Sequence, residues 1–309
     1  MSLFLGIDTS NYTTSVATFE NSLITHNLKK PVYVKPGERG ARQSDAVFSH
    51  VKNFPEIMHE LGEIKPTAIG VSIRPRDVEG SYMPCFLSGY AVASALASSF
   101  NVPLYTFSHQ AGHVRAALYS SGRLDLIGET FIAFHVSGGT TEVLLCENDK
   151  ISCVGGTCDI NAGQLIDRIG VALGLSFPCG KELEMICDFE AMKRERLSCR
   201  ISVNGLNANL SGLENKAINY LKNGASKQAV AAFIISSIEK TLCALANNAR
   251  EIYGSFPIIF SGGVSSNRHL RSSLQRKFGA FFAEPSFSAD NAAGISLLCH
   301  ERYLMDHGI

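Results

Sequence analysis

The sequence predicts an α/β fold of two lobes, and three observations lead to that prediction. The chain has 309 residues, 45% of them hydrophobic, which is enough for two lobes with a substantial core. A β-strand, a polar turn and a second β-strand follow one another twice, at residues 3–19 and at residues 131–146. A third glycine turn, Gly262-Gly263, leads from an apolar run into a segment of helical character.

The turns of these units are rich in glycine and hydroxyl side chains. Ser137-Gly138-Gly139 separates two apolar strands, with Thr140 beside it. Taken alone, it could be an ordinary hairpin turn, but glycine also lets a ligand approach the backbone. Two lobes with such turns facing a cleft are the plan of the actin-like ATPases, sugar kinases and Hsp70, where backbone N–H groups hold nucleotide phosphates. We therefore expect the actin-like ATPase fold, with two RNase H-like lobes around a nucleotide cleft.

Composition limits the possible partners. Formal net charge is zero, with 28 residues of each sign, so an RNA contact would need a local basic patch or a partner protein. Nine cysteines occur singly, without a CxxC pair, and no signal peptide or transmembrane run is evident. We expect reduced thiols, a cytoplasmic location and no membrane contact.

The first lobe is expected at residues 1–102. Residues 29–43 are basic and rich in glycine and proline, which indicates an exposed loop, either solvated or in contact with RNA. Helical spacing of apolar residues follows at 44–61, then a short strand at 68–73 and a small-residue helix at 87–100. The last helix, about 292–309, is expected to complete this lobe.

Two histidines follow the next strand. Ser108 can cap a helix in which His109 and His113 are four residues apart and share a face, the spacing of a metal-ligand pair. A structural or surface role is the alternative. A zinc protease would need glutamate as general base at the second position, where Gln110 cannot accept a proton.

The second lobe is expected at residues 103–291 and to carry the metal and nucleotide site. A helix at 162–173 has Asp159 and Asn161 as possible caps, and Asp167 in its middle is either solvated or holds a ribose. Residues 185–200 form a second basic cluster, and 227–253 form a long amphipathic helix. Asp290, before the last helix, could be a simple cap.

Six motifs occur in one order along the chain: SHQAGH, VSGGTTE, AGQLIDR, NANLSGLENKA, SGGVSSNRHLR and SADNAAG. Together they resemble the tRNA threonylcarbamoyladenosine synthase family, once described as O-sialoglycoprotein endopeptidase of peptidase family M22. The resemblance covers residues 3 to about 298. It implies transfer of a threonylcarbamoyl group from its adenylate to the adenosine beside the tRNA anticodon. It also implies ATP or adenylate in the cleft, one divalent metal ion and small accessory proteins.

The resemblance also implies which residues form the site. It implies three metal ligands that suit iron or zinc: His109, His113 and Asp290. It implies a phosphate turn and three nucleoside contacts: Ser137, Gly138, Gly139, Asp167, Gly180 and Asn267. No catalytic residue is identified, and three hydroxyl residues are expected to line the cleft: Thr9, Ser10 and Thr140.

The chain departs from the family motifs at four positions. Tyr12 and Thr13 replace an acidic pair, Thr140 replaces a histidine and Gln164 replaces a glutamate. Groups that can accept a proton are therefore missing where a general base could act, unless His135 substitutes from its strand. Three interpretations stay open: the family transferase, a carbamoyl transferase with another acceptor, or a non-catalytic nucleotide-binding partner of the true synthase.

Overall fold

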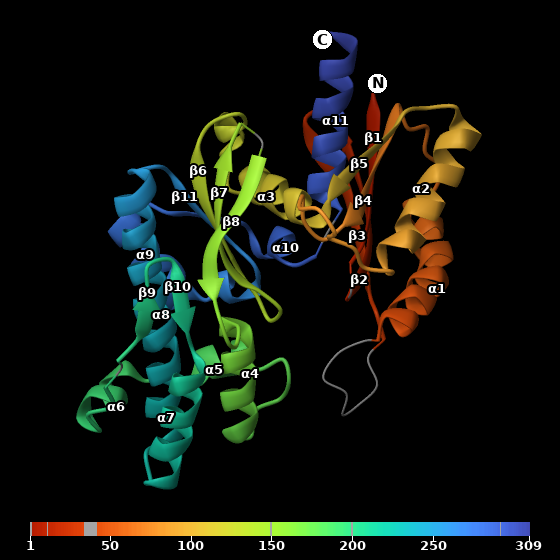
Figure 1. Ribbon diagram of the computed structural model, residues 1–309. Helices are drawn as coiled ribbons and strands as arrows, with labels where there is room; N and C mark the ends of the chain where they lie inside the picture. Colours follow the sequence, from red (N-terminus) through yellow and green to blue (C-terminus); the bar gives the residue numbers. More distant parts are fainter. Residues whose placement is uncertain (1, 11, 34–41, 149, 199, 291) are drawn as a thin grey trace. The chain divides into compact units, whose positions relative to one another are not determined.

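The computed structural model describes residues 2–10, 12–33, 42–148, 150–198, 200–290 and 292–309 (Figure 1). It has two compact units: unit 1 is Met1–Gly122 with Ala289–Ile309, and unit 2 is Arg123–Ser288. The boundary falls at Gly122 rather than at the expected residue 102. The reason is that the histidine helix packs on the last helix, within unit 1, and so does not belong to the expected second lobe.

Unit 1 contains a five-stranded sheet in the order β3-β2-β1-β4-β5. β1, β2 and β3 are antiparallel neighbours, whereas β4 and β5 run parallel to β1. The strands span β1 Leu3–Thr9, β2 Thr13–Glu20, β3 Leu23–Pro31, β4 Ala68–Arg74 and β5 Leu104–Ser108. Lys29 and Lys30 thus lie in β3, paired with β2, and not in the loop expected at 29–43. Lys35 and Arg39 of that loop lie outside the described residues.

Two helices cover each face of this sheet (Figure 1). α1 (Gln43–Leu61) and α2 (Phe86–Phe100) pack on one face, and α3 (His109–Ser120) and α11 (Ala293–His307) on the other. Because side chains alternate along a strand, Leu5 and Ile7 of β1 join the apolar cluster with α1 and α2. Phe4, by contrast, packs edge-on against Tyr303 of α11. Asp8 lies four residues after Phe4 in β1, and this even spacing places its side chain on the same face, towards α3 and α11.

Unit 2 contains a seven-stranded sheet in the order β12-β11-β6-β7-β8-β10-β9. Its strands span β6 Phe131–Val136, β7 Thr141–Glu147, β8 Lys150–Thr157, β9 Ser202–Asn204, β10 Asn207–Asn209, β11 Ile258–Ser261 and β12 Phe281–Phe282. β6 and β7 form the expected antiparallel hairpin, and β11 pairs with β6 in parallel.

Five helices of unit 2, α4, α5, α6, α7 and α9, pack on one long helix, α8. The helices of this unit span α4 Ala162–Ala172, α5 Gly180–Ile186, α6 Phe189–Arg194, α7 Ser211–Lys222, α8 Lys227–Tyr253, α9 Arg268–Phe278 and α10 Pro285–Ser288. The same unit contains two short 3₁₀ helices, Leu124–Leu126 and Gly263–Ser266. α8 is long and apolar enough to cross a membrane, but 78% of its most apolar stretch is buried, as expected of a core helix. The predicted helices near 44–61, 87–100, 162–173 and 227–253 are confirmed.

Candidate functional site

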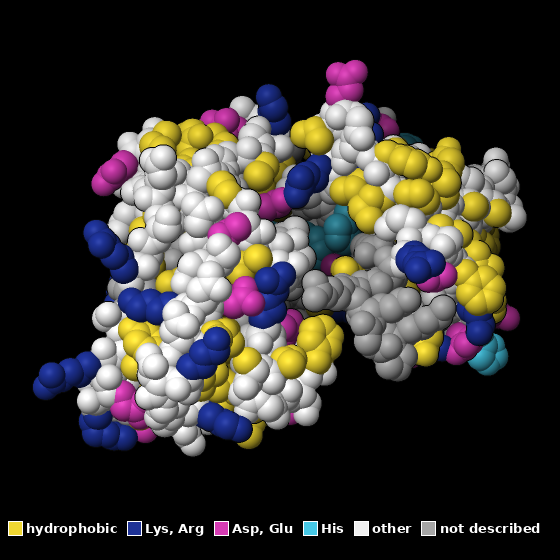
Figure 2. All heavy atoms as spheres, turned by 60° about the horizontal axis from the view of Figure 1, so that its bottom comes forward, with side chains coloured by type: hydrophobic (Ala, Val, Ile, Leu, Met, Phe, Trp, Pro, Cys, Tyr) yellow, Lys and Arg dark blue, Asp and Glu magenta, His cyan; other side chains and the backbone are white. Residues whose placement is uncertain are grey.

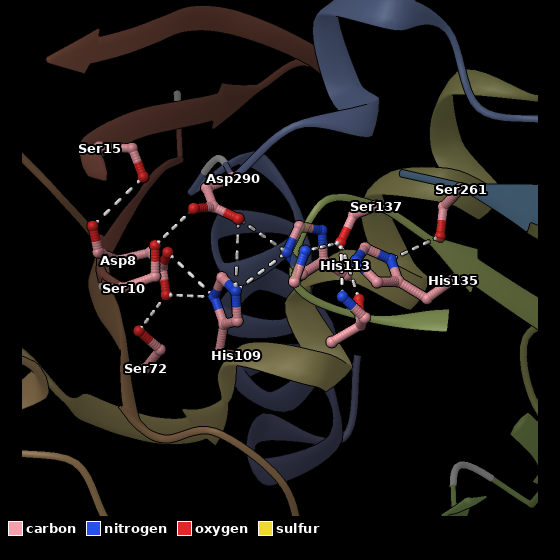
Figure 3. Close-up of polar contacts among 12 residues, drawn as sticks. Asp8, Ser10, Ser15, Ser72, His109, His113, His135, Ser137, Ser261 and Asp290 are labelled. Carbon is pink, nitrogen blue, oxygen red and sulfur yellow. Dashed lines mark hydrogen bonds and ion pairs between the residues drawn. The ribbon is translucent and has the colours of Figure 1, made fainter. Parts of the chain in front are cut away.

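Three side chains predicted as metal ligands meet in unit 1 (Figure 3). Ser108 caps α3 by accepting a hydrogen bond from Ala111 N at 3.1 Å, so the helix starts at His109. The Nε2 atoms of His109 and His113 are 2.9 Å apart. Asp290 Oδ1, just before α11, lies 3.6 Å from the first and 3.3 Å from the second.

These separations fit a single metal ion. Donor atoms at the roughly 2.1 Å typical of zinc lie about 3.0 Å apart in octahedral and about 3.4 Å apart in tetrahedral coordination. The three observed separations, 2.9, 3.3 and 3.6 Å, are close to these edge lengths. Two imidazoles and one carboxylate suit iron, zinc or manganese. Within the described part of the chain, this is the one His, Cys, Asp and Glu group that could hold a metal ion.

Further polar side chains form hydrogen bonds to two of the three candidate ligands. Asp8, fully buried at the end of β1, accepts a hydrogen bond from His109 Nδ1 at 2.9 Å. Ser72 Oγ of β4 donates to the same carboxylate, and Ser10 Oγ donates to Asp290 Oδ2 at 2.8 Å. A carboxylate behind a ligating imidazole fixes the ring and directs its other nitrogen at the metal. Asp8 was not predicted as a site residue; the available signal was an acidic residue directly after the apolar run Leu3–Ile7.

The charges around this site shift the pKa values of two of its side chains. Burial would lower the pKa of His109, but the carboxylates of Asp8 and Asp290 raise it to about 10. Burial would raise the pKa of Asp290, but the two histidines hold it well below its ordinary value. A metal ion binds the unprotonated imidazole, so a raised pKa of His109 means that metal affinity should increase with pH.

Two glycines allow α3 and α11 to approach closely at this site. A Cβ on Gly294 would lie 1.8 Å from the carbonyl oxygen of Gly112. A Cβ on Gly112 would lie 2.9 Å from Cδ1 of Ile295. Only glycine fits at this crossing, which places the two histidines of α3 next to Asp290 at the start of α11.

Ser10 and Thr9, both expected to line the cleft, point to opposite faces of the sheet. Ser10 contacts Asp290, as described. Thr9 instead points to the opposite face of the sheet, where its hydroxyl donates to the Cys85 carbonyl at 3.0 Å and accepts from Gly89 N. Thr9 therefore anchors α2 and does not face the metal ligands, because adjacent strand residues point to opposite faces.

The predicted phosphate turn lies in unit 2, at the N-terminus of α4. Ser137 Oγ contacts Thr140 Oγ1 at 2.8 Å, while Gly138 and Gly139 are exposed. A Cβ on Gly163 of α4 would lie 2.6 Å from Gly138 Cα. The N–H group of Gly139 donates to Ser137 Oγ at 3.3 Å within the turn. The exposed backbone of this turn lies beside a helix N-terminus, a position that can bind an anion such as phosphate.

The three predicted nucleoside contacts lie on neighbouring elements of unit 2. Asp167 of α4 accepts a hydrogen bond from Cys179 N at 2.8 Å, next to Gly180 at the start of α5. Burial raises the pKa of Asp167, and this hydrogen bond only partly offsets the effect. Asn267 caps α9, and the N–H of the following Arg268 donates to Glu184 of α5 at 2.9 Å. α4, α5 and α9 are thus connected by hydrogen bonds.

The departures from the family motifs have local structural roles. Gln164 Oε1 accepts from Asn161 N at 3.0 Å and completes a capping box at the start of α4. His135 Nδ1 lies 3.0 Å from Ser261 Oγ, between β6 and β11. Thr140 belongs to the Ser137 turn. Thr140 and Gln164 stand where the family motifs have a histidine and a glutamate, and neither side chain can accept a proton as a general base.

Solved structures share the fold of this protein. The activator of 2-hydroxyisocaproyl-CoA dehydratase from Clostridium difficile aligns over 99% of this chain and 97% of its own, with 14% identity and a TM-score of 0.55. HypF from T. kodakarensis aligns over 99% of this chain and 48% of its own, with 14% identity and a TM-score of 0.60. The protein has the actin-like ATPase fold.

Sequence similarity then gives the family. The profile described as tRNA N6-adenosine threonylcarbamoyltransferase (TsaD) matches residues 56–297, and the chain belongs to this family. It is 28% identical to the protein of that name from Thermosipho melanesiensis, over 96% of this chain and 93% of the relative. It is 26% identical to a probable bifunctional tRNA threonylcarbamoyladenosine biosynthesis protein from Thermoplasma volcanium, of which it spans about half, 55%.

Proposed function

We propose that this protein transfers a threonylcarbamoyl group from threonylcarbamoyl-adenylate to the adenosine next to the tRNA anticodon. The supporting observation is the geometry of His109, His113 and Asp290, whose donor atoms all lie within 4.8 Å of one another in a chain of this family. These residues would hold one divalent ion, iron or zinc. The bound ion would supply Lewis acidity and a fixed positive charge beside the substrate.

The residues of the chain position the reactants. Asp8 keeps the His109 ring in one orientation, and Ser10 does the same for Asp290. The Ser137 turn would bind the phosphate of the adenylate and stabilise the AMP that leaves as the acyl group is transferred. The nucleoside would contact Asp167, Gly180 and Asn267.

Catalysis in this protein would depend on position and charge more than on a general base. The four motif departures place no carboxylate or imidazole at Tyr12, Thr13, Thr140 or Gln164. Holding an acceptor amine next to an activated carbonyl, in a fixed electrostatic environment, can supply much of a rate enhancement.

Binding of tRNA would need local contacts and accessory proteins. Lys and Arg side chains are interspersed with acidic ones on the face shown in Figure 2. In the second basic cluster, Lys193 pairs with Glu190 at 2.7 Å and Arg194 lies 3.7 Å from Asp188, which reduces its net charge. A reaction on tRNA implies a cytoplasmic location, and the eight described cysteines are free thiols.

The test is a transfer assay with the purified protein, threonylcarbamoyl-adenylate, unmodified tRNA and the accessory proteins of the family. Nucleoside mass spectrometry measures the modified adenosine, and an active family member serves as the positive control. Modification by this protein, abolished in His109→Ala, would support the proposal. Modification by the control alone would refute it.

The four motif departures favour a second candidate. The protein would bind ATP and metal, and either carbamoylate another acceptor or act as a non-catalytic partner of the true synthase. Turnover of the adenylate without tRNA would indicate another acceptor. Nucleotide binding without any turnover, combined with stimulation of an active synthase, would indicate the partner role.

A further inference from the structure

The residues at the carboxyl ends of β4 and β5 hold the first turn of the helix that carries the two histidines. The first amide groups of a helix have no partner within it and need one elsewhere. Pro75, directly after β4, accepts a hydrogen bond from Gln110 N of α3 at 3.0 Å. Ser108, the last residue of β5, accepts from Ala111 N through Oγ at 3.1 Å. Two amide groups of the first turn of α3 are thus held from outside the helix.

The Ser108 hydroxyl has a partner of its own in the loop that follows β4. Ser108 is buried, and its Oγ donates to Asp77 Oδ2 at 2.7 Å. A hydroxyl has one hydrogen, so donating it to Asp77 leaves the oxygen lone pairs for Ala111 N. A hydrogen bond to an ionised carboxylate is stronger than one between neutral groups. Asp77 therefore fixes the direction in which Ser108 caps α3.

Arg74 holds the Asp77 carboxylate in place. Its Nε and Nη2 atoms donate to Asp77 Oδ1 at 3.1 and 2.8 Å, whereas Ser108 uses Oδ2. Arg74 is the last residue of β4 and pairs with Ser108 in the sheet. The three side chains form one run of hydrogen bonds from β4, through the loop, to the first turn of α3.

We propose that Asp77 is a positioning residue of the candidate metal centre, on which it acts through Ser108 and the first turn of α3. His109 directly follows Ser108, and its Nε2 lies 2.9 Å from that of His113. Metal–ligand distances tolerate only about 0.2 Å of change, so a small shift of this turn is enough to weaken metal binding. The inference rests on the metal centre of the proposed function and deepens it.

Asp125 provides a matched control. Arg123 donates to it through the same two nitrogen atoms, Nε and Nη2, both at 2.8 Å. Asp125 lies in a 3₁₀ helix of unit 2, whereas the metal ligands belong to unit 1. Asp77→Ala and Asp125→Ala each remove an Arg–Asp ion pair between partly exposed side chains. Only the first removes the acceptor of the Ser108 hydroxyl.

The experiment is a competitive zinc titration of the full chain at fixed pH, with thermal unfolding of the metal-free protein measured in parallel. Asp77→Ala should weaken zinc binding about tenfold, the lower end of the loss expected when a group that orients metal ligands is removed. Asp125→Ala should bind zinc as tightly as the wild type.

A double variant tests the route through Ser108. Ser108→Gly removes the hydroxyl but keeps a residue that is tolerated at a helix N-cap, so it should also weaken zinc binding. If Asp77 acts through Ser108, Asp77→Ala should cause no further loss in the Ser108→Gly protein, because the hydrogen bond is already gone. Two independent effects on folding would instead multiply in the double variant.

Three results would overturn the inference. These are unchanged zinc affinity in Asp77→Ala, an equal loss in Asp125→Ala, or losses that multiply in the double variant. Asp77→Ser, whose hydroxyl ends one bond short of the carboxylate oxygens, replaces the alanine variant if circular dichroism shows that variant to be unfolded.

The titration requires neither adenylate nor tRNA, which separates this inference from the proposed function. A failed transfer assay with Asp77-dependent zinc binding would refute the proposed function and leave the inference standing. Normal transfer with unchanged zinc affinity in Asp77→Ala would refute the inference alone. A wild-type protein that binds no zinc would overturn the inference as well as the metal centre.

Discussion

The glycine crossing between α3 and α11 yields the most decisive prediction about the metal centre. In Gly294→Ala, the new Cβ would lie 1.8 Å from the Gly112 carbonyl oxygen, whereas ordinary contacts begin near 3.4 Å. The helices must therefore move apart by more than about 1 Å, and such overpacking typically costs about 1–3 kcal/mol. At an unconstrained helix position, the same change would stabilise by up to about 1 kcal/mol, so the sign of the effect is informative.

The same movement should weaken metal binding. Asp290 precedes α11 and both histidines lie on α3, so separating the helices lengthens the 3.3 and 3.6 Å donor separations. Metal–ligand distances tolerate only about 0.2 Å of change, so we expect at least a tenfold loss of zinc affinity.

The assay combines thermal unfolding of the metal-free protein with competitive zinc titration. Gly212→Ala is the control, because a Cβ there meets nothing within 4 Å. It should leave zinc affinity unchanged and unfold at the same or a slightly higher temperature. If Gly294→Ala binds zinc as tightly as the wild type and is no less stable, the close crossing does not position the ligands.

Three further predictions concern single residues. Asp8→Asn should lower zinc affinity about 10- to 100-fold with little loss of folding, because the His109 imidazole loses the carboxylate that orients it. Equilibrium dialysis measures the zinc affinity. Gly163→Ala should weaken adenosine monophosphate binding, measured by calorimetry, because its Cβ would lie 2.6 Å from Gly138 Cα and displace the phosphate turn. Glu239→Gln should reduce stability at neutral pH by about 3 kcal/mol, measured by urea unfolding. Burial would raise the pKa of Glu239, but hydrogen bonds from Lys277, Ser273 and His269 lower it from 4.5 to about 2. Its folded pKa is thus depressed, so the contribution is complete above about pH 4.5 and is lost as pH falls towards 2.

Each of these predictions has an outcome that contradicts it. Equal zinc affinity in Asp8→Asn would mean that Asp8 does not orient His109. Unchanged nucleotide affinity in Gly163→Ala would place phosphate binding elsewhere. Glu190→Gln removes an exposed partner of Lys193 and should change stability little. A Glu239→Gln variant that behaves the same way would show that the partly buried Glu239 cluster contributes nothing.

The sequence alone determined the fold class, the family and the two candidate metal ligands that lie one helix turn apart. Helical spacing of apolar residues located α1, α4 and α8, because burial of one face imposes that period. The spacing of His109 and His113 placed both rings on one face of α3, since four residues make about one turn. These features depend on neighbours in the chain, which the sequence displays directly.

The tertiary structure alone decided which side chains contact the candidate ligands that the sequence had named. Ser10 and Asp290 are 280 positions apart in the sequence, yet their side chains are hydrogen-bonded. Thr9 and Asp8 are adjacent but face opposite helices, and only the packing of α3 and α11 on the sheet decides which of them meets His109. Lys29 looked like a loop residue until its pairing with Ser15 placed it in the Asp8 row. A strand fixes that its side chains alternate, but what covers each face depends on contacts between residues far apart in the chain.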